Sequence, residues 1–367
     1  MAESKTATKG ASGVAMEGQG SGVASGVTIL HGGDLDGARL AFPHAPEPWV
    51  DLSTGINPWP YPLPPIPADA WNRLPARGAE EGLRAAAAAC YGAPSAAHVA
   101  AASGSQALIQ LLPRLRAPGT VAVLAPTYAE HAACWAGAGH EVREVAGLDA
   151  LTDGDGADVV VVVNPNNPDG RTLSVAALLG LAERQAARGG WLVVDEAFAD
   201  ADPAASVAGF ADQPGLVVLR SFGKFFGLAG LRLGIALCAP DLAGALRAAI
   251  GPWAVSGPGL TVATAALADR AWIDATRRRL TAAAAALDAR LAAVGLRVIG
   301  GTSLFRLVAD RRAAALYRGL GEAGLLTRRF ERQAEWLRLG LPPDEESVIR
   351  LHDACVRILA VTDPSAR

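Results

Sequence analysis

One uninterrupted run of β-branched residues constrains the fold of this chain more than any other feature. The segment DVVVVVN (158–164) contains five consecutive valines with no polar residue between them. A strand with one solvated face alternates apolar and polar side chains, whereas a strand buried on both faces does not. Strands of the second kind belong to parallel sheets that helices cover on both sides. The run therefore predicts a central strand of an α/β sheet.

Helical and strand patterns alternate on both sides of this run, between about residue 80 and residue 240. Helical patterns cover 80–92, 105–115, 128–139 and 175–189, and strand patterns cover 98–103, 119–126, 140–145, 191–198 and 215–221. This alternation predicts an α/β fold with a mostly parallel sheet flanked by helices. Beyond Pro240 the chain changes to alanine-rich helices, with short strand patterns at 296–301, 303–308 and 335–341 and a last helix from Asp344. A smaller C-terminal α/β domain is expected there.

These patterns divide the chain into four parts. We expect a disordered Gly/Ser/Ala-rich tail (1–26), an N-terminal arm with a proline-rich segment (27–75), a large cofactor-binding domain (76–240) and a small domain (241–367). The tail lacks the basic start and apolar core of a secretory signal. The proline-rich run INPWPYPLPPIP (56–67) is expected to lie extended over the surface.

The composition favours a cytoplasmic enzyme. The 367 residues are 51% hydrophobic and carry a net charge of −3, which argues against a nucleic-acid partner. The four cysteines are far apart and form no CxxC pair, so neither a disulfide framework nor a zinc site is indicated. No apolar run has the roughly 18–20 residues of a membrane span. No metal site and no membrane partner are expected.

A set of polar residues around one lysine indicates the chemistry. Lys224 lies in the apolar, glycine-rich segment SFGKFFGLAGLRLG (221–234), which is a poor setting for an idle ammonium group. Asp195 and Ser221 each end a strand pattern, and open α/β sheets bind ligands at the carboxyl ends of their strands. A cofactor aldehyde needs an amine, its ring nitrogen needs a carboxylate, and its phosphate needs hydroxyl and guanidinium donors. Lys224, Asp195, Ser221 and Arg232 meet these needs and predict a pyridoxal-phosphate site.

The order of these residues, with Asn167 in NPNNPDG upstream and Arg232 eight residues after the lysine, resembles the aspartate-aminotransferase-like superfamily of pyridoxal-phosphate enzymes, of fold type I. The resemblance runs from about His31 to the C-terminus. It implies that Lys224 and Asp195 are catalytic. It also implies that the cofactor is bound by Ser105, Gln106, Tyr128, Asn167, Asp195, Ser221, Lys224 and Arg232. A helix N-terminus after Gly104 suits the phosphate in any case. A homodimer is implied by the family's shared active site.

Two arginines are expected to bind the substrate. Arg338 in EWLRLGLP matches the family arginine that grips the substrate carboxylate, a task suited to a guanidinium group. Arg328 in GLLTRRFE lies where relatives with phosphorylated substrates place an arginine for the distal phosphate, and the adjacent Arg329 is an alternative.

Three positions depart from the usual aminotransferase pattern. Phe198 stands where most members have a tyrosine that donates to the cofactor oxygen, and phenylalanine cannot donate. Leu74 replaces a tyrosine that crosses the dimer, and Gly223 replaces the serine before the lysine. These departures make transamination less favoured.

Together with HGGD (31–34) and DLSTGINPWP (51–60), they make the chain similar to the threonine-phosphate decarboxylases of cobalamin biosynthesis. The similarity implies decarboxylation of L-threonine O-3-phosphate to (R)-1-amino-2-propanol O-2-phosphate. It places His31 and the backbone of Gly32 and Gly33 at the substrate phosphate, and Asn57 near the substrate carboxylate. Two alternatives stay open: an aminotransferase of the histidinol-phosphate type, and a non-catalytic effector-binding module. A flexible turn with an exposed histidine is the alternative for HGGD.

Overall fold

The computed structural model describes residues 31–152 and 156–362. The expected tail at 1–26 lies outside the described residues. All statements on the fold below refer to the described ranges.

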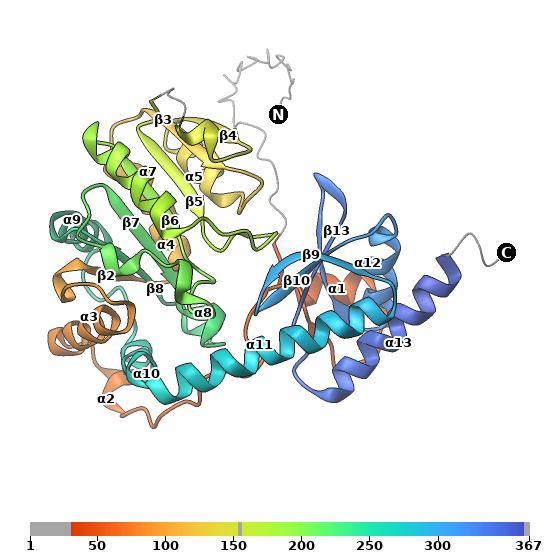
Figure 1. The fold of residues 1–367 in the computed structure, drawn as a ribbon. Coiled ribbons are helices and arrows are strands. Elements are labelled where there is room, and N and C mark those ends of the chain that lie inside the picture. The colour runs from red at the N-terminus through yellow and green to blue at the C-terminus, as the bar shows by residue number, and fades with distance from the viewer. Residues whose placement is uncertain (1–30, 153–155, 363–367) are drawn as a thin grey trace, which may run out of the picture. The chain divides into compact units, whose positions relative to one another are not determined.

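A seven-stranded sheet organises the described residues up to Cys238 (Figure 1). Its strand order is β2-β8-β7-β6-β5-β3-β4, and the strands from β7 to β4 pair in parallel. The strands are β2 (Val99–Ala102), β3 (Thr120–Leu124), β4 (Glu141–Val145), β5 (Val159–Val163), β6 (Trp191–Asp195), β7 (Leu216–Ser221) and β8 (Gly234–Cys238). The predicted mostly parallel sheet is thus confirmed.

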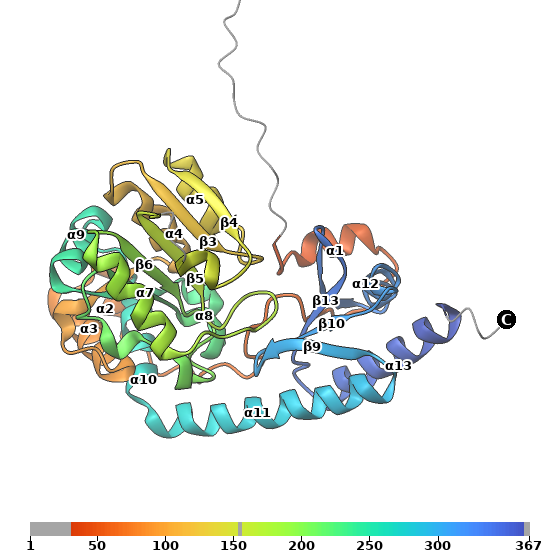
Figure 2. The same cartoon turned by 45° about the horizontal axis from the view of Figure 1, so that its top comes forward.

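The valine run forms β5, and each of its five residues is buried. Its side chains alternate between two hydrophobic cores: Val159 and Val161 pack in one, Val160 and Val162 in the other. Side chains of α4 and α5 share the first core, and those of α3 and α7 share the second (Figure 2). Helices therefore cover both faces of the sheet, which explains why the run has no polar alternation.

Strand β8 was not predicted. It is a short apolar segment, GIALC, that pairs antiparallel with both β7 and β2. Its glycine start and its position next to the lysine motif obscure the strand pattern in the sequence. Because β8 runs antiparallel, the chain from β7 can return through the short lysine segment without a long crossover.

The helices expected at 80–92, 105–115, 128–139, 175–189 and from Asp344 are present with shifts of a few residues at their ends, whereas α1, α2, α6 and α8 were not predicted. The helices are α1 (Leu35–Ala41), α2 (Asp69–Asn72), α3 (Arg77–Tyr91), α4 (Ser105–Leu111), α5 (Glu130–Gly137), α6 (Asp149–Thr152), α7 (Val175–Ala187), α8 (Phe222–Phe225), α9 (Pro240–Ile250), α10 (Gly257–Ala268), α11 (Arg270–Ala293), α12 (Ala313–Glu322) and α13 (Glu345–Thr362). None of them has the length and apolar character needed to cross a membrane, as far as the described residues go.

A second sheet lies in the C-terminal part, and the long helix α11 extends toward it in both views (Figures 1 and 2). The sheet is antiparallel, with the order β12-β13-β10-β9. Its strands are β9 (Arg297–Thr302), β10 (Phe305–Ala309), β12 (Arg328–Phe330) and β13 (Gln333–Gly340). The predicted domain boundary at residue 240 stays a prediction.

The N-terminal arm is tied to this C-terminal part. Strand β1 (Val50–Asp51) pairs in parallel with β11 (Leu325–Leu326). The proline-rich run after β1 has no helix or regular strand, but Asn57 and Tyr61 are buried. Most of the run is exposed or partly exposed, in agreement with that expectation, and the two buried residues anchor it. Its anchor is the backbone beyond the lysine, because Tyr61 N–H donates to the Phe226 carbonyl at 2.9 Å.

A buried ion-pair network connects the ends of β6 and β7. The Arg220 guanidinium lies 2.9 Å from the Glu196 carboxylate and 3.3 Å from that of Asp200, and all three side chains are buried. Burial raises the pKa of both carboxyl groups, and the charge of Arg220 opposes that shift. Glu196 follows Asp195, and Arg220 precedes Ser221. The network therefore fixes the two strand ends that carry predicted site residues.

Breaking this network is expected to destabilise the fold. Glu196→Ala leaves the Arg220 guanidinium buried with one partner fewer, so the free energy of unfolding should fall by about 3–5 kcal/mol. The matched control is Glu345→Ala, which removes an exposed ion pair with Arg290 of the same 2.9 Å length and should cost at most about 1 kcal/mol. Denaturant unfolding of both variants tests this, and equal losses would contradict it.

Candidate active site

The predicted site residues Asp195, Ser221 and Lys224 come together at adjacent strand ends. Asp195 is the last residue of β6 and Ser221 the last of β7, and these strands are hydrogen-bonded neighbours. Helix α8, which carries Lys224, follows β7 directly. This is the carboxyl edge of the parallel strands, where open α/β sheets bind ligands.

The Lys224 amine has a polar and an aromatic neighbour. Its Nζ donates to the Thr54 carbonyl at 3.3 Å and lies 5.6 Å from the centre of the Phe198 ring. Burial, together with the charge of Arg338, lowers the pKa of Lys224 from 10.5 to about 8, although Asp195 acts in the opposite direction. A substantial fraction of the amine is therefore neutral near pH 8, as a nucleophile requires.

Asp195 is buried and firmly oriented. Its Oδ2 lies 2.8 Å from Nε2 of His131, and its Oδ1 accepts a hydrogen bond from the Ala197 N–H at 3.0 Å. His131 is itself buried, on α5. His131 was not predicted from the sequence. The sequence feature that points to it is its position three residues after Tyr128, about one helical turn.

The Arg232 guanidinium lies close to the start of α4. Gly104, with φ of +92°, precedes Ser105, and a side chain at Gly104 would begin 2.7 Å from the Arg232 guanidinium. A side chain at Gly234 would begin 2.1 Å from the backbone nitrogen of Ser105. Both positions thus require glycine for close approach. Arg232 itself has φ of +54°, a strained conformation for a residue other than glycine. The free N–H groups of α4, the Arg232 guanidinium and the Ser221 hydroxyl are donors suited to a phosphate.

Tyr128 and Gln106 belong to a hydrogen-bonded chain. The Tyr128 hydroxyl donates to Oε1 of Gln106 at 3.2 Å, and Nε2 of Gln106 donates to Glu130 at 2.8 Å. Glu130 also lies 3.0 Å from Nε2 of His31. Burial and the nearby Glu130 raise the pKa of Tyr128, so its hydroxyl remains a donor. Glu130 is a second residue that the sequence analysis missed.

Arg338 spans two parts of the site. From β13 it donates to Oδ1 of Asn167 at 2.5 Å and to the Ser53 carbonyl at 2.6 Å. Its side chain is buried, and its Nε has no hydrogen-bond partner among the described residues. Burial and the neighbouring Arg328 lower its pKa. A buried donor without a partner beside a second cation fits an anionic ligand.

Arg328 and Arg329 point in different directions. Arg328 on β12 pairs across the strands with Arg338 on β13, and it is half-buried. Arg329 is exposed, and its guanidinium lies 5.0 Å from the centre of the Tyr317 ring. Successive residues of a strand face opposite sides, so the geometry favours Arg328 over Arg329 as the arginine that serves the site.

The N-terminal segment packs against residues 51–54. A side chain at Gly32 would begin 2.6 Å from the Ser53 carbonyl oxygen. The Gly33 N–H donates to the Ser53 hydroxyl at 2.8 Å, and that hydroxyl donates to Asp51 at 2.6 Å. The same stretch, through the carbonyls of Ser53 and Thr54, binds Arg338 and Lys224. HGGD therefore contacts the stretch that also binds Arg338 and Lys224, while its role at a substrate phosphate stays a prediction.

Asn57 holds the lysine turn. Its side-chain amide donates to the Phe225 carbonyl at 2.8 Å, and its backbone N–H donates to the Lys224 carbonyl at 2.9 Å. Both groups are therefore committed to the turn. The predicted position of Asn57 near a substrate carboxylate stays a prediction.

Two of the three departures have a local physical reason. A side chain at Gly223 would begin 2.8 Å from Cα of Ala229, so a serine could enter only if the backbone moved. Phe198 is buried against Phe305, with ring centres 5.0 Å apart, where a hydroxyl would need a partner. Leu74 is 67% exposed, and the structure offers no reason for it within one chain.

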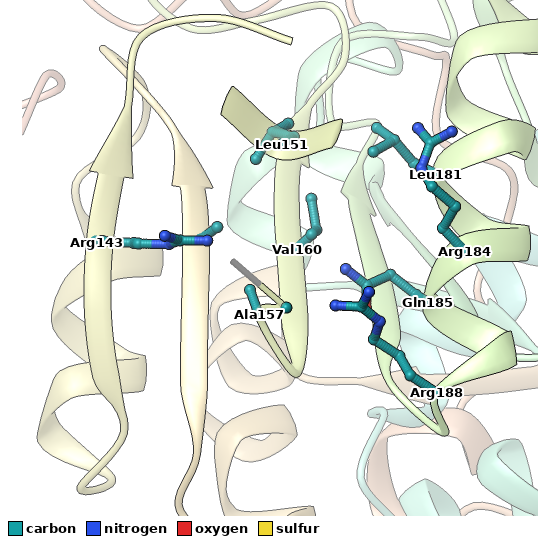
Figure 3. Close-up of a pocket in the computed structure, with 10 residues that line it drawn as sticks. Arg143, Leu151, Ala157, Val160, Leu181, Arg184, Gln185 and Arg188 are labelled. Atoms are coloured by element: carbon teal, nitrogen blue, oxygen red, sulfur yellow. The ribbon is translucent and has the colours of Figure 1, made fainter. Parts of the chain in front are cut away.

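A small cavity of about 30 Å³ lies away from these residues (Figure 3). It is bordered by β3, β4, β5 and α7 and is lined by Arg143, Arg184 and Arg188, among others. None of the predicted site residues borders it. Its volume suits about one water molecule and excludes a substrate.

Comparison with known proteins gives a consistent result. The family model described as "Aminotransferase class I and II" matches residues 69–354. The chain is 50% identical over 326 residues to a threonine-phosphate decarboxylase from Pseudomonas aeruginosa, which covers 89% of this chain and 97% of that protein. It is 48% identical to the protein of the same name from Sinorhizobium sp., over 90% of this chain and 98% of that protein. A histidinol-phosphate aminotransferase from Psychrobacter arcticus is 31% identical over 60% of each chain.

Solved structures agree on the fold. Histidinol-phosphate aminotransferase from Sinorhizobium meliloti, in complex with pyridoxal-5'-phosphate, aligns with a TM-score of 0.68 and 24% identity over 80% of this chain and 84% of that chain. L-threonine-O-3-phosphate decarboxylase from Porphyromonas gingivalis aligns with a TM-score of 0.66 and 19% identity, over 78% of this chain and 93% of that chain.

The lowered pKa of Lys224 gives a test of the site that needs no substrate. Since the neutral amine reacts with an aldehyde, cofactor-free protein should take up pyridoxal phosphate faster as pH rises, and the rate should level off above pH about 8, not near 10.5. Stopped-flow absorbance between pH 6 and 10 measures this rate, and a midpoint determined to about one pH unit is sufficient. A midpoint near that of an ordinary lysine would contradict the burial of this amine.

Proposed function

The chain belongs to the class I and II aminotransferase family, and we propose that it decarboxylates L-threonine O-3-phosphate with pyridoxal 5'-phosphate as cofactor. The products are (R)-1-amino-2-propanol O-2-phosphate and carbon dioxide, and the reaction serves cobalamin biosynthesis. One observation carries the choice of substrate: Arg328 and Arg338 pair across two strands beside the buried Lys224 amine. Two guanidinium groups next to an amine suit a ligand with a carboxylate and a phosphate. The two relatives at 50% and 48% identity support the same reaction.

The donor set fits pyridoxal phosphate. The Arg232 guanidinium against Gly104 and the start of α4 at Ser105 provide the phosphate cradle. Asp195, oriented by His131, suits a protonated ring nitrogen. Residues proposed to hold the cofactor are Ser105, Gln106, Tyr128, Asn167, Asp195, Ser221, Lys224 and Arg232. The bound cofactor supplies an electron sink for the electron pair left at the substrate Cα.

The residues around this position have separate tasks. Asp195 holds a proton at the ring nitrogen, because its carboxylate is buried and fixed by two hydrogen bonds. Lys224 first serves as the nucleophilic amine and then delivers the proton that Cα requires when carbon dioxide has left. With a pKa of about 8, the amine can both hold and release that proton near neutral pH.

Substrate orientation decides which bond breaks. The bond at Cα that is perpendicular to the conjugated ring is the one activated, so the residues that bind the carboxylate and the phosphate select decarboxylation. Arg338 is the proposed partner of the carboxylate, and Arg328 and His31, with the backbone of Gly32, are those of the phosphate. Phe198 lacks the hydroxyl that most aminotransferases present at its position.

An aminotransferase of the histidinol-phosphate type is the second candidate, because proteins of that name share both sequence and fold with the chain. It is less favoured, since the sequence identity is lower and covers less of the chain. The sequence-based alternative of a non-catalytic module is disfavoured by Lys224, whose buried amine would have no purpose there.

We further propose a cytoplasmic homodimer. Leu63, Trp71, Leu74 and Trp253 expose between 53% and 68% of their surface, and a second copy of the chain would cover them. Trp71 lies on α2, which packs against α10, and Trp253 shortly precedes α10. Cys90, Cys134, Cys238 and Cys355 are free thiols, which suits a reducing compartment.

The reaction itself is tested with purified protein, pyridoxal phosphate and threonine phosphate. We expect carbon dioxide and aminopropanol phosphate in equal amounts, and the Lys224→Ala variant should give neither product, because it lacks the amine. Glutamate formation in the presence of 2-oxoglutarate is measured in parallel. If glutamate exceeds carbon dioxide, the protein is the aminotransferase instead.

Variants of Arg338 and Arg328 should differ in which substrate they affect. Arg338→Ala should weaken the binding of L-threonine and of threonine phosphate alike, since both substrates carry the carboxylate. Arg328→Ala should raise KM for threonine phosphate by at least about tenfold, because a charge-assisted contact to the phosphate is lost. The difference in KM between threonine phosphate and L-threonine should therefore become smaller. Arg329→Ala is the matched control on the exposed side of β12. An Arg329 variant as impaired as the Arg328 variant would contradict the assignment.

A further inference from the structure

Glu130 contacts two side chains of the proposed site. It begins α5 and is 17% exposed at its side chain. Its Oε1 lies 3.0 Å from Nε2 of His31, and its Oε2 accepts from Nε2 of Gln106 at 2.8 Å. The thiol of Cys134 lies 3.9 Å from Oε2. Both carboxylate oxygens are therefore engaged by side chains that we assign to phosphate binding.

A carboxylate here works against the site's anionic ligands. Two phosphates and a substrate carboxylate are proposed to bind in this region, and like charges at short range repel one another. A neutral side chain of similar size would avoid that repulsion. The first turn of a helix favours an acid, so the contacts of Glu130, and not its presence alone, show which groups it can act upon.

The His31 ring has reason to need support. It is 49% exposed, and its edge faces Tyr128 with ring centres 6.2 Å apart. A half-exposed imidazole on a glycine-rich segment has several accessible orientations, and fixing one of them costs conformational entropy on binding. By accepting from Nε2, Glu130 fixes the ring orientation, and Nδ1 of the protonated ring is then the donor that can meet a phosphate.

We propose that Glu130 is a positioning residue that orients His31 for the distal phosphate of the substrate. The proposal rests on the proposed function. Through Gln106, which accepts from the Tyr128 hydroxyl, the same carboxylate links this substrate contact to the cofactor-binding residues. Glu130 thereby acts on specificity for a phosphorylated substrate and not on bond breaking.

The test is a double-mutant cycle in the holoenzyme. Apparent Kd values for threonine phosphate and for L-threonine are measured from the change in the visible spectrum of the bound cofactor. Glu130→Ala and His31→Ala should each raise the apparent Kd for threonine phosphate by about tenfold and that for L-threonine by less than about twofold, because only the phosphate contact is lost. The double variant should bind threonine phosphate no more weakly than His31→Ala alone, since both changes remove the same contact. Glu130→Gln, which retains an acceptor for His31, should recover part of the affinity.

Two controls separate the possible outcomes. Glu81→Ala, which removes an exposed ion pair with Arg77 of 3.0 Å, should behave as wild type. Gln106→Ala removes a donor to Glu130 and should weaken cofactor binding, but it should change the ratio of the two substrate affinities less than Glu130→Ala does. Unchanged affinity in Glu130→Ala, equal losses for both substrates, or additive losses with His31→Ala would each overturn the proposal while leaving the proposed function intact. A wild-type protein that fails to prefer threonine phosphate and releases no carbon dioxide would instead overturn the proposed function, and the role of Glu130 with it.

Discussion

The rest of the site depends on the side-by-side carboxyl ends of β6 and β7. Asp195 and Ser221 end these strands, and Lys224 follows Ser221 on the short helix α8. Behind them, the buried contacts of Arg220 with Glu196 and Asp200 hold the same two strand ends from the other side. The backbone that presents the reactive groups is therefore fixed by a charge network that never meets a ligand. A displacement of about 1 Å at such a position is enough to lower catalysis strongly.

Lys224 can have a lowered pKa because other elements close over it. The arm residues Ser53, Thr54 and Asn57 contact Arg338, the Lys224 amine and the lysine turn, respectively. Strand β1 joins this arm to the C-terminal part of the chain. Segments that are more than a hundred residues apart in sequence thus create the burial that sets the chemistry of one amine.

The sequence predicted the features that rest on local pattern. The valine run indicates β5, and Asp195 and Ser221 follow from the apolar strands they end. It could not predict His131 or Glu130, because each gains its role from partners more than twenty residues away, respectively Asp195 and the pair His31 and Gln106. Strand β8 was missed for a similar reason, since its pairing with β2 and β7 is a tertiary property. The burial of Asn57 and Tyr61 within the proline-rich run depends on backbone partners at 224–226, which no composition reveals.

Charge balance connects these observations. Lys224, Arg232, Arg328 and Arg338 gather around a site where burial lowers the pKa of Lys224, Arg328 and Arg338. A lowered pKa in a cation means that the folded protein holds that charge at a cost. An anionic cofactor and substrate would bring countercharges to these groups, so ligand binding would recover part of that free energy. Among the described residues, the buried Nε of Arg338 has no hydrogen-bond partner. A neutral substrate would bring no countercharge, and the site thereby discriminates by charge before any contact with the reacting bond is made.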